Sequence, residues 1–183
     1  VDALLGGDGL HVLVNNAGTT FRGEEAYKPE NFEATIDINL NSVYRLSHRL
    51  FPKLKASGGS IINIASMTSY FGSPRGPGYG ASKSAILQMT MSLGARWAAD
   101  GVRVNAIAPG FITGRWWLER LGQEAYDKMV AGVEQSVPLN HAGTPEDMAE
   151  TALFLLTNSA NITGEILLCD SGHHLGGAPL IAR

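Results

Sequence analysis

Residues 66–83 read SMTSYFGSPRGPGYGASK and connect an apolar strand, predicted at 61–65, to a long helix, predicted at 80–100. The glycines and prolines at positions 72–78 exclude both strand and helix from the loop between them. Tyr79 and Lys83 stand four residues apart at the helix start, so their side chains lie on one face, one turn apart. With the hydroxyl of Ser66 at the strand end, this phenol and ammonium form a candidate proton-transfer site.

The pKa of tyrosine decides whether such a site works at neutral pH. A free tyrosine titrates near pH 10. An ammonium about 4 Å away, at an effective dielectric constant near 20, favours the phenolate by up to about 4 kcal/mol. The sequence therefore predicts that Lys83 lowers the pKa of Tyr79 toward neutral pH, where general acid–base catalysis is most efficient. Taken singly, each of these residues is more often an ordinary surface residue than a catalytic one.

Strands and helices alternate along the whole chain. Strands are predicted at 10–15, 61–65, 102–108 and 165–169, and helices at 29–55, 80–100 and 145–156, with amphipathic pieces within 111–137. This alternation predicts a parallel sheet covered by helices on both faces, with ligands bound outside the carboxyl ends of the strands. Polar residues, glycines and prolines collect at those ends, at 15–18, 66, 109–113 and 170–172. We expect residues 1–183 to form one domain.

Composition excludes several classes of protein. The net charge of −3 offers no basic field for nucleic acid or for an anionic membrane. No apolar run approaches the roughly 20 residues of a membrane span. The single cysteine, Cys169, suits a reducing compartment, so the sequence predicts a soluble, cytoplasmic protein. His173 and His174 are adjacent, without ligand spacing or acidic partners, and predict no metal site.

The motifs resemble, in order and spacing, those of the short-chain dehydrogenase/reductase family. They are Asn16-Ala17-Gly18, Asn39, Ser66, Tyr79-x-x-x-Lys83 and Pro109-Gly110, and the resemblance covers about 10–175. It implies an oxidoreductase that transfers a hydride between NAD or NADP and a small carbonyl or alcohol substrate.

The resemblance also implies the role of each site residue. Tyr79 would be the general acid/base, and Ser66 would stabilise the substrate oxygen. Lys83 would lower the pKa of Tyr79 and bind the nicotinamide ribose, and Asn39 would hold a water that links Lys83 to solvent. The implied cofactor-binding residues are Asn15, Asn16, Ala17, Gly18, Tyr79, Lys83, Pro109, Gly110, Ile112 and Thr113.

The sequence departs from the family at two places. The family more often has its threonine one position after Thr113, where this chain has Gly114. The glycine-rich phosphate turn of relatives has no counterpart, because the glycines at 6–9 precede a strand instead of following one. We therefore expect only the C-terminal portion of a doubly wound, Rossmann-like sheet, truncated by about 60 to 80 residues, with strand 10–15 as an exposed apolar edge. The choice between NAD and NADP stays open.

Two alternatives use the same scaffold. The chain could be a non-catalytic fragment or subunit whose helices at 31–50 and 80–99 serve oligomerisation, or a lyase that uses no nicotinamide. Lyases of this family usually carry arginine at the position of Lys83. The apolar circumference of helix 80–100 and the resemblance predict a homodimer or homotetramer. Tyr70, Phe111, Trp116 and Trp117 indicate an apolar substrate pocket, and the two tryptophans are predicted equally well as a lid or as packing.

Overall fold

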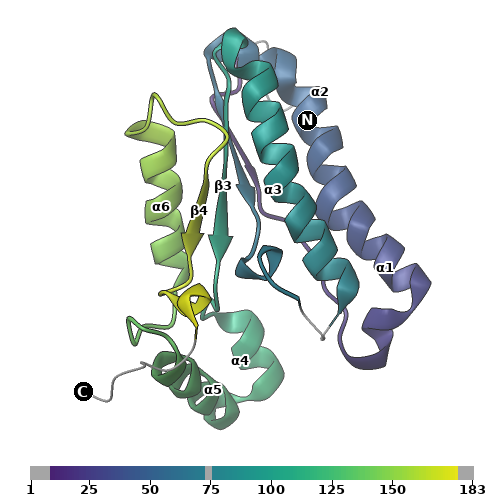
Figure 1. The fold of residues 1–183 in the computed structure, drawn as a ribbon, viewed down its shortest axis with the longest axis vertical. Coiled ribbons are helices and arrows are strands. Elements are labelled where there is room, and N and C mark those ends of the chain that lie inside the picture. The colour runs from purple at the N-terminus through teal and green to yellow at the C-terminus, as the bar shows by residue number, and fades with distance from the viewer. Residues whose placement is uncertain (1–8, 73–75, 177–183) are drawn as a thin grey trace.

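The computed structural model describes residues 9–72 and 76–176, so the glycines at 6–8 and Pro74 lie outside the described residues. Its sheet has four parallel strands in the order β1-β2-β3-β4, and Figure 1 shows α3 on one side of it and α6 on the other. The predicted Rossmann-like α/β fold is confirmed. The strands are β1 (Val12–Asn15), β2 (Ser60–Ile64), β3 (Arg103–Pro109) and β4 (Ile166–Cys169).

The helices occupy the segments between and after the strands. The α-helices are α1 (Pro29–Ile36), α2 (Ser42–Ser57), α3 (Pro77–Trp97), α4 (Arg115–Leu121), α5 (Gln123–Ser136) and α6 (Pro145–Thr157). Short helices are η1 (Gly23–Tyr27), η3 (Met67–Ser69), η4 (Ala98–Asp100) and η5 (His173–Leu175), and a π-helix, η2 (Asp37–Asn41), joins α1 to α2. No helix in the described part of the chain combines the length and the apolar character of a membrane span.

Each face of the sheet has its own core, because successive side chains of a strand point to opposite faces. Ile61 of β2 packs with Leu54 of α2 and Trp97 of α3. The next residue, Ile62, packs with Leu155 of α6 on the other face. Apolar residues on both faces of β2 are typical of a parallel sheet covered on both sides.

β1 forms one edge of the sheet and pairs with β2. Val12 and Val14 on this strand are 41% and 46% exposed, while Leu13 between them is buried in the core. The expected apolar edge strand is therefore confirmed.

The helix predicted at 29–55 differs from the observed one. It continues to Ser57, but the π-helix η2 interrupts its regular α-helical pattern. A π-helix adds a residue to a turn, and here that turn carries the buried Asn39. The side chain of Asn39 hydrogen-bonds to groups outside its own helix, which a regular hydrophobic period does not encode.

The start of α3 also differs from the prediction. α3 begins at Pro77, three residues before the predicted start, because a proline at the first helical position loses no intrahelical hydrogen bond. Gly78 then packs against α1, where an added Cβ would lie 3.2 Å from Cδ2 of Phe32. Tyr79 and Lys83 are thus both inside the first turns of α3, on a rigid element.

α6 begins as the sequence predicts. The Thr144 side chain accepts a hydrogen bond from the Asp147 backbone N–H, and the Asp147 carboxylate accepts one from the Thr144 backbone N–H, forming a capping box. The neighbouring His141 side chain and the Thr144 hydrogen bonds lower the pKa of Asp147 to about 2. The helix that covers one face of the sheet is therefore anchored at its first turn.

Candidate active site

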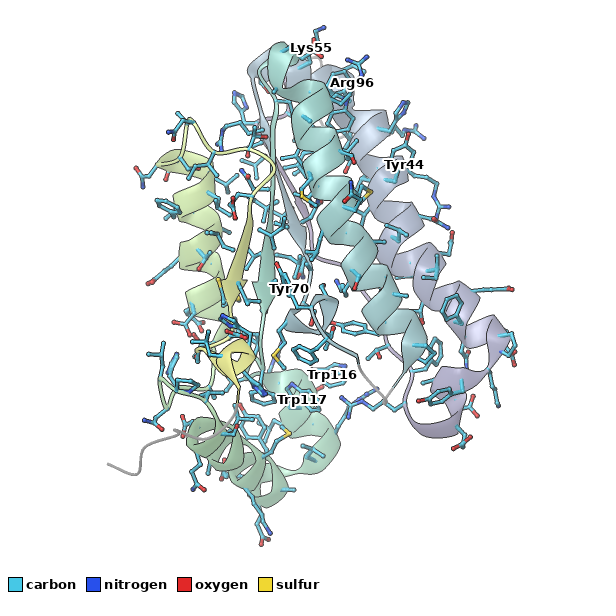
Figure 2. The ribbon with its side chains drawn as sticks, viewed as in Figure 1. Tyr44, Lys55, Tyr70, Arg96, Trp116 and Trp117 are labelled. Atoms are coloured by element: carbon cyan, nitrogen blue, oxygen red, sulfur yellow. The ribbon has the colours of Figure 1, made fainter. Side chains whose placement is uncertain are left out.

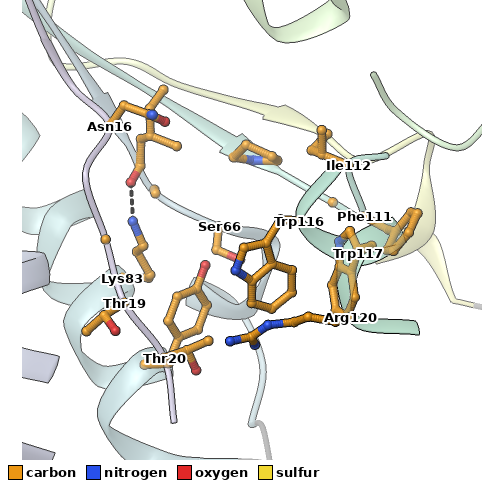
Figure 3. Close-up of a pocket in the computed structure, with 16 residues that line it drawn as sticks. Asn16, Thr19, Thr20, Ser66, Lys83, Phe111, Ile112, Trp116, Trp117 and Arg120 are labelled. Carbon is orange, nitrogen blue, oxygen red and sulfur yellow. Dashed lines mark hydrogen bonds between the residues drawn. The ribbon is translucent and has the colours of Figure 1, made fainter. Parts of the chain in front are cut away.

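A cavity of about 430 Å³ lies at the carboxyl ends of β1, β2 and β3, where it is bounded by α3 and α4 (Figure 3). This is the edge of the sheet at which parallel α/β folds bind their ligands. The cavity is lined by Asn16, Gly18, Thr19, Thr20, Ile64, Ala65, Ser66, Tyr79, Lys83, Pro109, Gly110, Phe111, Ile112, Trp116, Trp117 and Arg120.

Ser66 and Tyr79 form the polar centre of this cavity. Ser66 directly follows the β2 end and caps η3, its Oγ accepting a hydrogen bond of 3.2 Å from the Thr68 backbone N–H. Burial raises the pKa of the Tyr79 phenol, and a hydrogen bond with Ser66 opposes that rise. The predicted proximity of Ser66 and Tyr79 is confirmed. The predicted lowering of the Tyr79 pKa is wrong, because burial raises this pKa.

Burial of the phenol is the largest influence on the Tyr79 pKa. The Nζ of Lys83 donates a hydrogen bond of 2.6 Å to the carbonyl oxygen of Ile64, shown by the dashed line in Figure 3. This Nζ lies 5.8 Å from the ring centroid of Tyr79. Lys83 is only 5% exposed, and this burial lowers its pKa to about 8. A group with that pKa is still mostly protonated at pH 7.

Asn39 connects the end of β1 to the start of α3. Its Oδ1 accepts a hydrogen bond of 2.7 Å from the Thr19 backbone N–H, and its Nδ2 donates to the Thr19 carbonyl at 2.9 Å and to Ser82 Oγ at 3.1 Å. The Ser82 hydroxyl in turn donates to the Tyr79 carbonyl. Asn39 is therefore a buried positioning residue rather than a solvated one, whereas Asn41 is exposed.

Two of the four predicted residues at the end of β1 line the cavity, namely Asn16 and Gly18. A Cβ on Gly18 would lie 3.3 Å from Asn39 Oδ1 and 3.7 Å from Lys83 Nζ, so glycine leaves open the space beside the ammonium. Asn15, the last residue of β1, is instead buried, and its Nδ2 donates to Ser47 Oγ and Asn63 Oδ1. Ala17 is not among the lining residues.

Three of the four predicted residues after β3 line the cavity, namely Pro109, Gly110 and Ile112. The fourth, Thr113, does not, because its hydroxyl and its backbone N–H both donate to the Gly143 carbonyl. Residues 170–172 do not line the cavity either. They pack behind it, and a Cβ on Gly110 would lie 2.7 Å from the Cβ of Asp170.

The α4 side of the cavity is aromatic and basic. Trp116 and Trp117 meet edge to face, with ring centroids 4.6 Å apart, and Phe111 lies 5.5 Å from Trp117. Both tryptophans line the cavity, and neither is buried in the core. Arg120, which sequence reasoning missed, stacks on Trp116 with its Cζ 4.2 Å from the ring centroid. Its spacing of four residues from Trp116 on a helix was the signal that could have found it.

A second, larger cavity of about 910 Å³ adjoins the first and shares Thr20, Tyr79, Trp116 and Trp117 with it. Tyr70, which the sequence assigned to the pocket, lines neither cavity and is 50% exposed (Figure 2). The other residues of this cavity are Phe21, Arg22, Gly23, Glu24, Tyr27, Thr68 and Gly76. Tyr79 thus lines both cavities.

The described residues fit a dinucleotide better than a metal ion. Within 9–72 and 76–176, no three histidine, cysteine or carboxylate side chains are grouped so that they could hold a metal. The open space at Gly18, beside a buried ammonium and the end of a parallel strand, has the character of a cradle for a ribose and its hydroxyls.

The chain is similar to dehydrogenases and reductases in sequence. The family model described as enoyl-(acyl carrier protein) reductase matches residues 3–174. The 3alpha-hydroxysteroid dehydrogenase of Mediterraneibacter gnavus is 39% identical over 167 residues, covering 88% of this chain and 64% of that protein. The 3-oxoacyl-(acyl-carrier-protein) reductase of Thermotoga maritima is 34% identical over 169 residues, covering 89% and 65%. The chain thus spans just under two thirds of the length of these curated relatives.

The chain is also similar in fold to solved structures. The aldohexose dehydrogenase of Thermoplasma acidophilum, in ligand-free form, superimposes with a TM-score of 0.87 at 27% identity, covering 96% of this chain and 71% of that one. A structure from Agrobacterium tumefaciens with bound NADP has a TM-score of 0.78 at 32% identity, covering 91% and 68%.

Proposed function

This chain belongs to the short-chain dehydrogenase/reductase family, and from that premise we propose that it is an NAD- or NADP-dependent oxidoreductase acting on a carbonyl or alcohol. The observation that carries the proposal is the meeting of Ser66, Tyr79 and Lys83 in one cavity at the carboxyl ends of the strands. The names of its relatives support an oxidoreductase, so we do not favour the non-catalytic or the lyase alternative.

In this proposal Tyr79 moves the proton and Ser66 holds the substrate oxygen. In reduction, the Tyr79 hydroxyl donates its proton to the oxygen of the substrate carbonyl, and in oxidation it takes the proton back. Burial raises the pKa of Tyr79, so at neutral pH the phenol carries the proton that the reduction requires. The Ser66 hydroxyl, within hydrogen-bonding reach of Tyr79, stabilises the charge that develops on the substrate oxygen.

The residues proposed to hold the dinucleotide are those of the cavity wall opposite α4. A bound nicotinamide would supply or accept the hydride. Lys83 presents a buried ammonium to the space at Gly18, where ribose hydroxyls would accept hydrogen bonds from it. Asn39 fixes the backbone of Thr19 beside that space. In this proposal Asn39 also holds a water that links Lys83 to solvent. The remaining proposed contacts are Asn16, Pro109, Gly110 and Ile112.

We propose that the chain assembles as a homodimer or homotetramer, which the exposed apolar side chains of Tyr44 on α2 and Met91 on α3 support. We also propose that it acts in the cytoplasm, which its single cysteine supports.

The first test is a titration of the purified protein with NADH and, separately, NADPH, followed by nicotinamide fluorescence. Saturable binding of either nucleotide supports the proposed cofactor and decides between the two. A folded protein that binds neither nucleotide would contradict it.

The second test is the Tyr79→Phe variant, assayed with whichever nucleotide binds. Removing a positioned acid/base costs about 10²- to 10⁴-fold in kcat, while nucleotide binding should be retained. Tyr70→Phe is the matched control, because Tyr70 is exposed and lines neither cavity. Undiminished turnover by Tyr79→Phe would refute the assignment.

A further inference from the structure

Four side chains at the α4 side of the site form an arginine–tryptophan cluster: Arg22, Trp116, Trp117 and Arg120. Arg22 belongs to the segment after β1, and the other three belong to α4. The Cζ of Arg22 lies 5.2 Å from the ring centroid of Trp116 and 4.6 Å from that of Trp117. Two cations therefore flank one pair of indole rings, from elements that are far apart in the sequence.

Arg120 is the member of this cluster best placed to bind a ligand. Among the described residues its contact is the stack on Trp116, and with these residues it forms no ion pair. Figure 3 shows its guanidinium beneath Trp116, extending from α4 toward Thr20. Stacking uses the face of a guanidinium and leaves its N–H edge available, and that edge matches a carboxylate bidentately.

The charges in the cavity point to the same class of ligand. Of the described residues that line it, Lys83 and Arg120 are basic and none is an aspartate or glutamate. In the adjoining cavity Arg22 is accompanied by one acidic residue, Glu24. The space next to Tyr79 is thus positive, and a low-dielectric cleft lined by one sign of charge attracts the opposite sign.

We propose that the substrate carries a carboxylate, which Arg120 binds while Tyr79 acts on the carbonyl or hydroxyl group, so that the substrate class is an oxo acid or hydroxy acid. This inference rests on the proposed function. The same guanidinium chemistry would also suit the diphosphate of the dinucleotide. The substrate is favoured because Trp116, on which Arg120 stacks, lines both cavities, and the wider one holds the second arginine of the cluster.

The test compares oxo acids of three to six carbons with their methyl esters, which keep the carbonyl and lose the charge. Calorimetry measures the dissociation constant of each, for protein saturated with the nucleotide that binds and for protein without nucleotide. A charge-assisted hydrogen bond contributes about 1.5–3 kcal/mol, so at least one acid should bind about 10- to 100-fold more tightly than its ester.

The Arg120→Gln variant should remove most of this preference for the acid, and Arg120→Lys should keep part of it, because lysine retains the charge without the planar fork. Arg115→Gln is the matched control, since Arg115 is an exposed arginine of the same helix that lines neither cavity. Arg115→Gln should leave the preference unchanged.

Each other outcome overturns the inference. Equal binding of acid and ester, or no binding of any pair, contradicts a carboxylate site. Weaker binding of NADH or NADPH by Arg120→Gln, with the acid preference intact, assigns the guanidinium to the cofactor phosphates. In all these cases the nucleotide titration and Tyr79→Phe still decide the proposed oxidoreductase independently.

Discussion

On the β2–α3 side of the cavity, Ser66 and Lys83 are buried and hydrogen-bonded to backbone groups, whereas on the α4 side Trp116 and Arg120 are exposed and held by ring contacts. The first side has one arrangement fixed by strand and helix geometry. The second side is a seven-residue helix without buried residues. We call the β2–α3 side the rigid side and the α4 side the exposed side. From this difference we expect the rigid side to perform the chemistry and the exposed side to select the substrate.

After Tyr79→Phe, Ser66→Ala gives the largest expected effect on the rigid side. Loss of a positioned donor to a developing oxyanion costs about 10²- to 10³-fold in kcat. Steady-state kinetics measures the loss, and Ser69→Ala is the control because the buried Ser69 hydroxyl has no hydrogen-bond partner among the described residues. If Ser69→Ala loses as much activity as Ser66→Ala, the rigid side owes its effect to packing instead of to the hydroxyl.

Asn39→Ala should show that the rigid side depends on positioning. The change removes the partners of the Thr19 backbone N–H and carbonyl, and orphaned groups of this kind cost about 1–3 kcal/mol in the free energy of unfolding. Denaturant unfolding measures the loss. The matched control is Asn41→Ala two residues later, whose exposed side chain hydrogen-bonds to Asp37 on the helix surface. Equal stabilities of the two variants would contradict the positioning role.

Lys83→Met should change how stability depends on pH. The pKa of Lys83 falls from 10.5 to about 8 on folding, so the unfolded chain binds more protons between these values, and its contribution to stability rises with pH there. Between pH 8 and pH 10 this rise should amount to about 2 kcal/mol.

The measurement is the difference in unfolding free energy between wild type and Lys83→Met across that pH range. Lys128→Met, which changes an exposed lysine of α5, should give a flat difference. A flat difference for Lys83→Met as well would mean that burial does not disfavour the charged form of Lys83.

Trp116→Leu should have the smallest effect. Unlike the changes on the rigid side, it should alter substrate binding and leave kcat and stability nearly unchanged. The indole packs on two guanidiniums and is 44% exposed, so we expect KM to rise roughly tenfold with kcat and thermal stability nearly unchanged. Trp97→Leu is the complement, because Trp97 is buried and stacked on Phe51, and it should lower the melting temperature without changing KM. A large fall in kcat for Trp116→Leu would break the proposed division of work.

Much of the rigid side could be predicted from the sequence, because local signals determine it. The apolar run before Ser66 and the spacing of Tyr79 and Lys83 identify a strand end and a helix face without any long-range information. The start of the helix at 145 was equally predictable. These features depend on residues within a few positions of one another.

The features that the sequence did not reveal depend on distant partners. The π-helix around Asn39 forms where Asn39 bonds to Thr19 and Ser82, which no hydrophobic period encodes. The direction of the Tyr79 pKa shift depends on the burial of the phenol, which only the assembled fold determines. Arg22 and Arg120 reach the same indole ring, that of Trp116, only when the segment after β1 folds against α4.

The π-helix η2 has a consequence for how the gene for this chain tolerates change. The wide turn absorbs one extra residue within a full turn, so the two flanking helices keep a common rotational phase. Loss of a single codon within 37–41 would close the wide turn to a regular α-turn and leave Leu50 and Leu54 facing the core. The same loss would disturb the turn that carries Asn39 and its bonds to Thr19 and Ser82, so such a reading-frame-neutral deletion should spare the fold and damage the site.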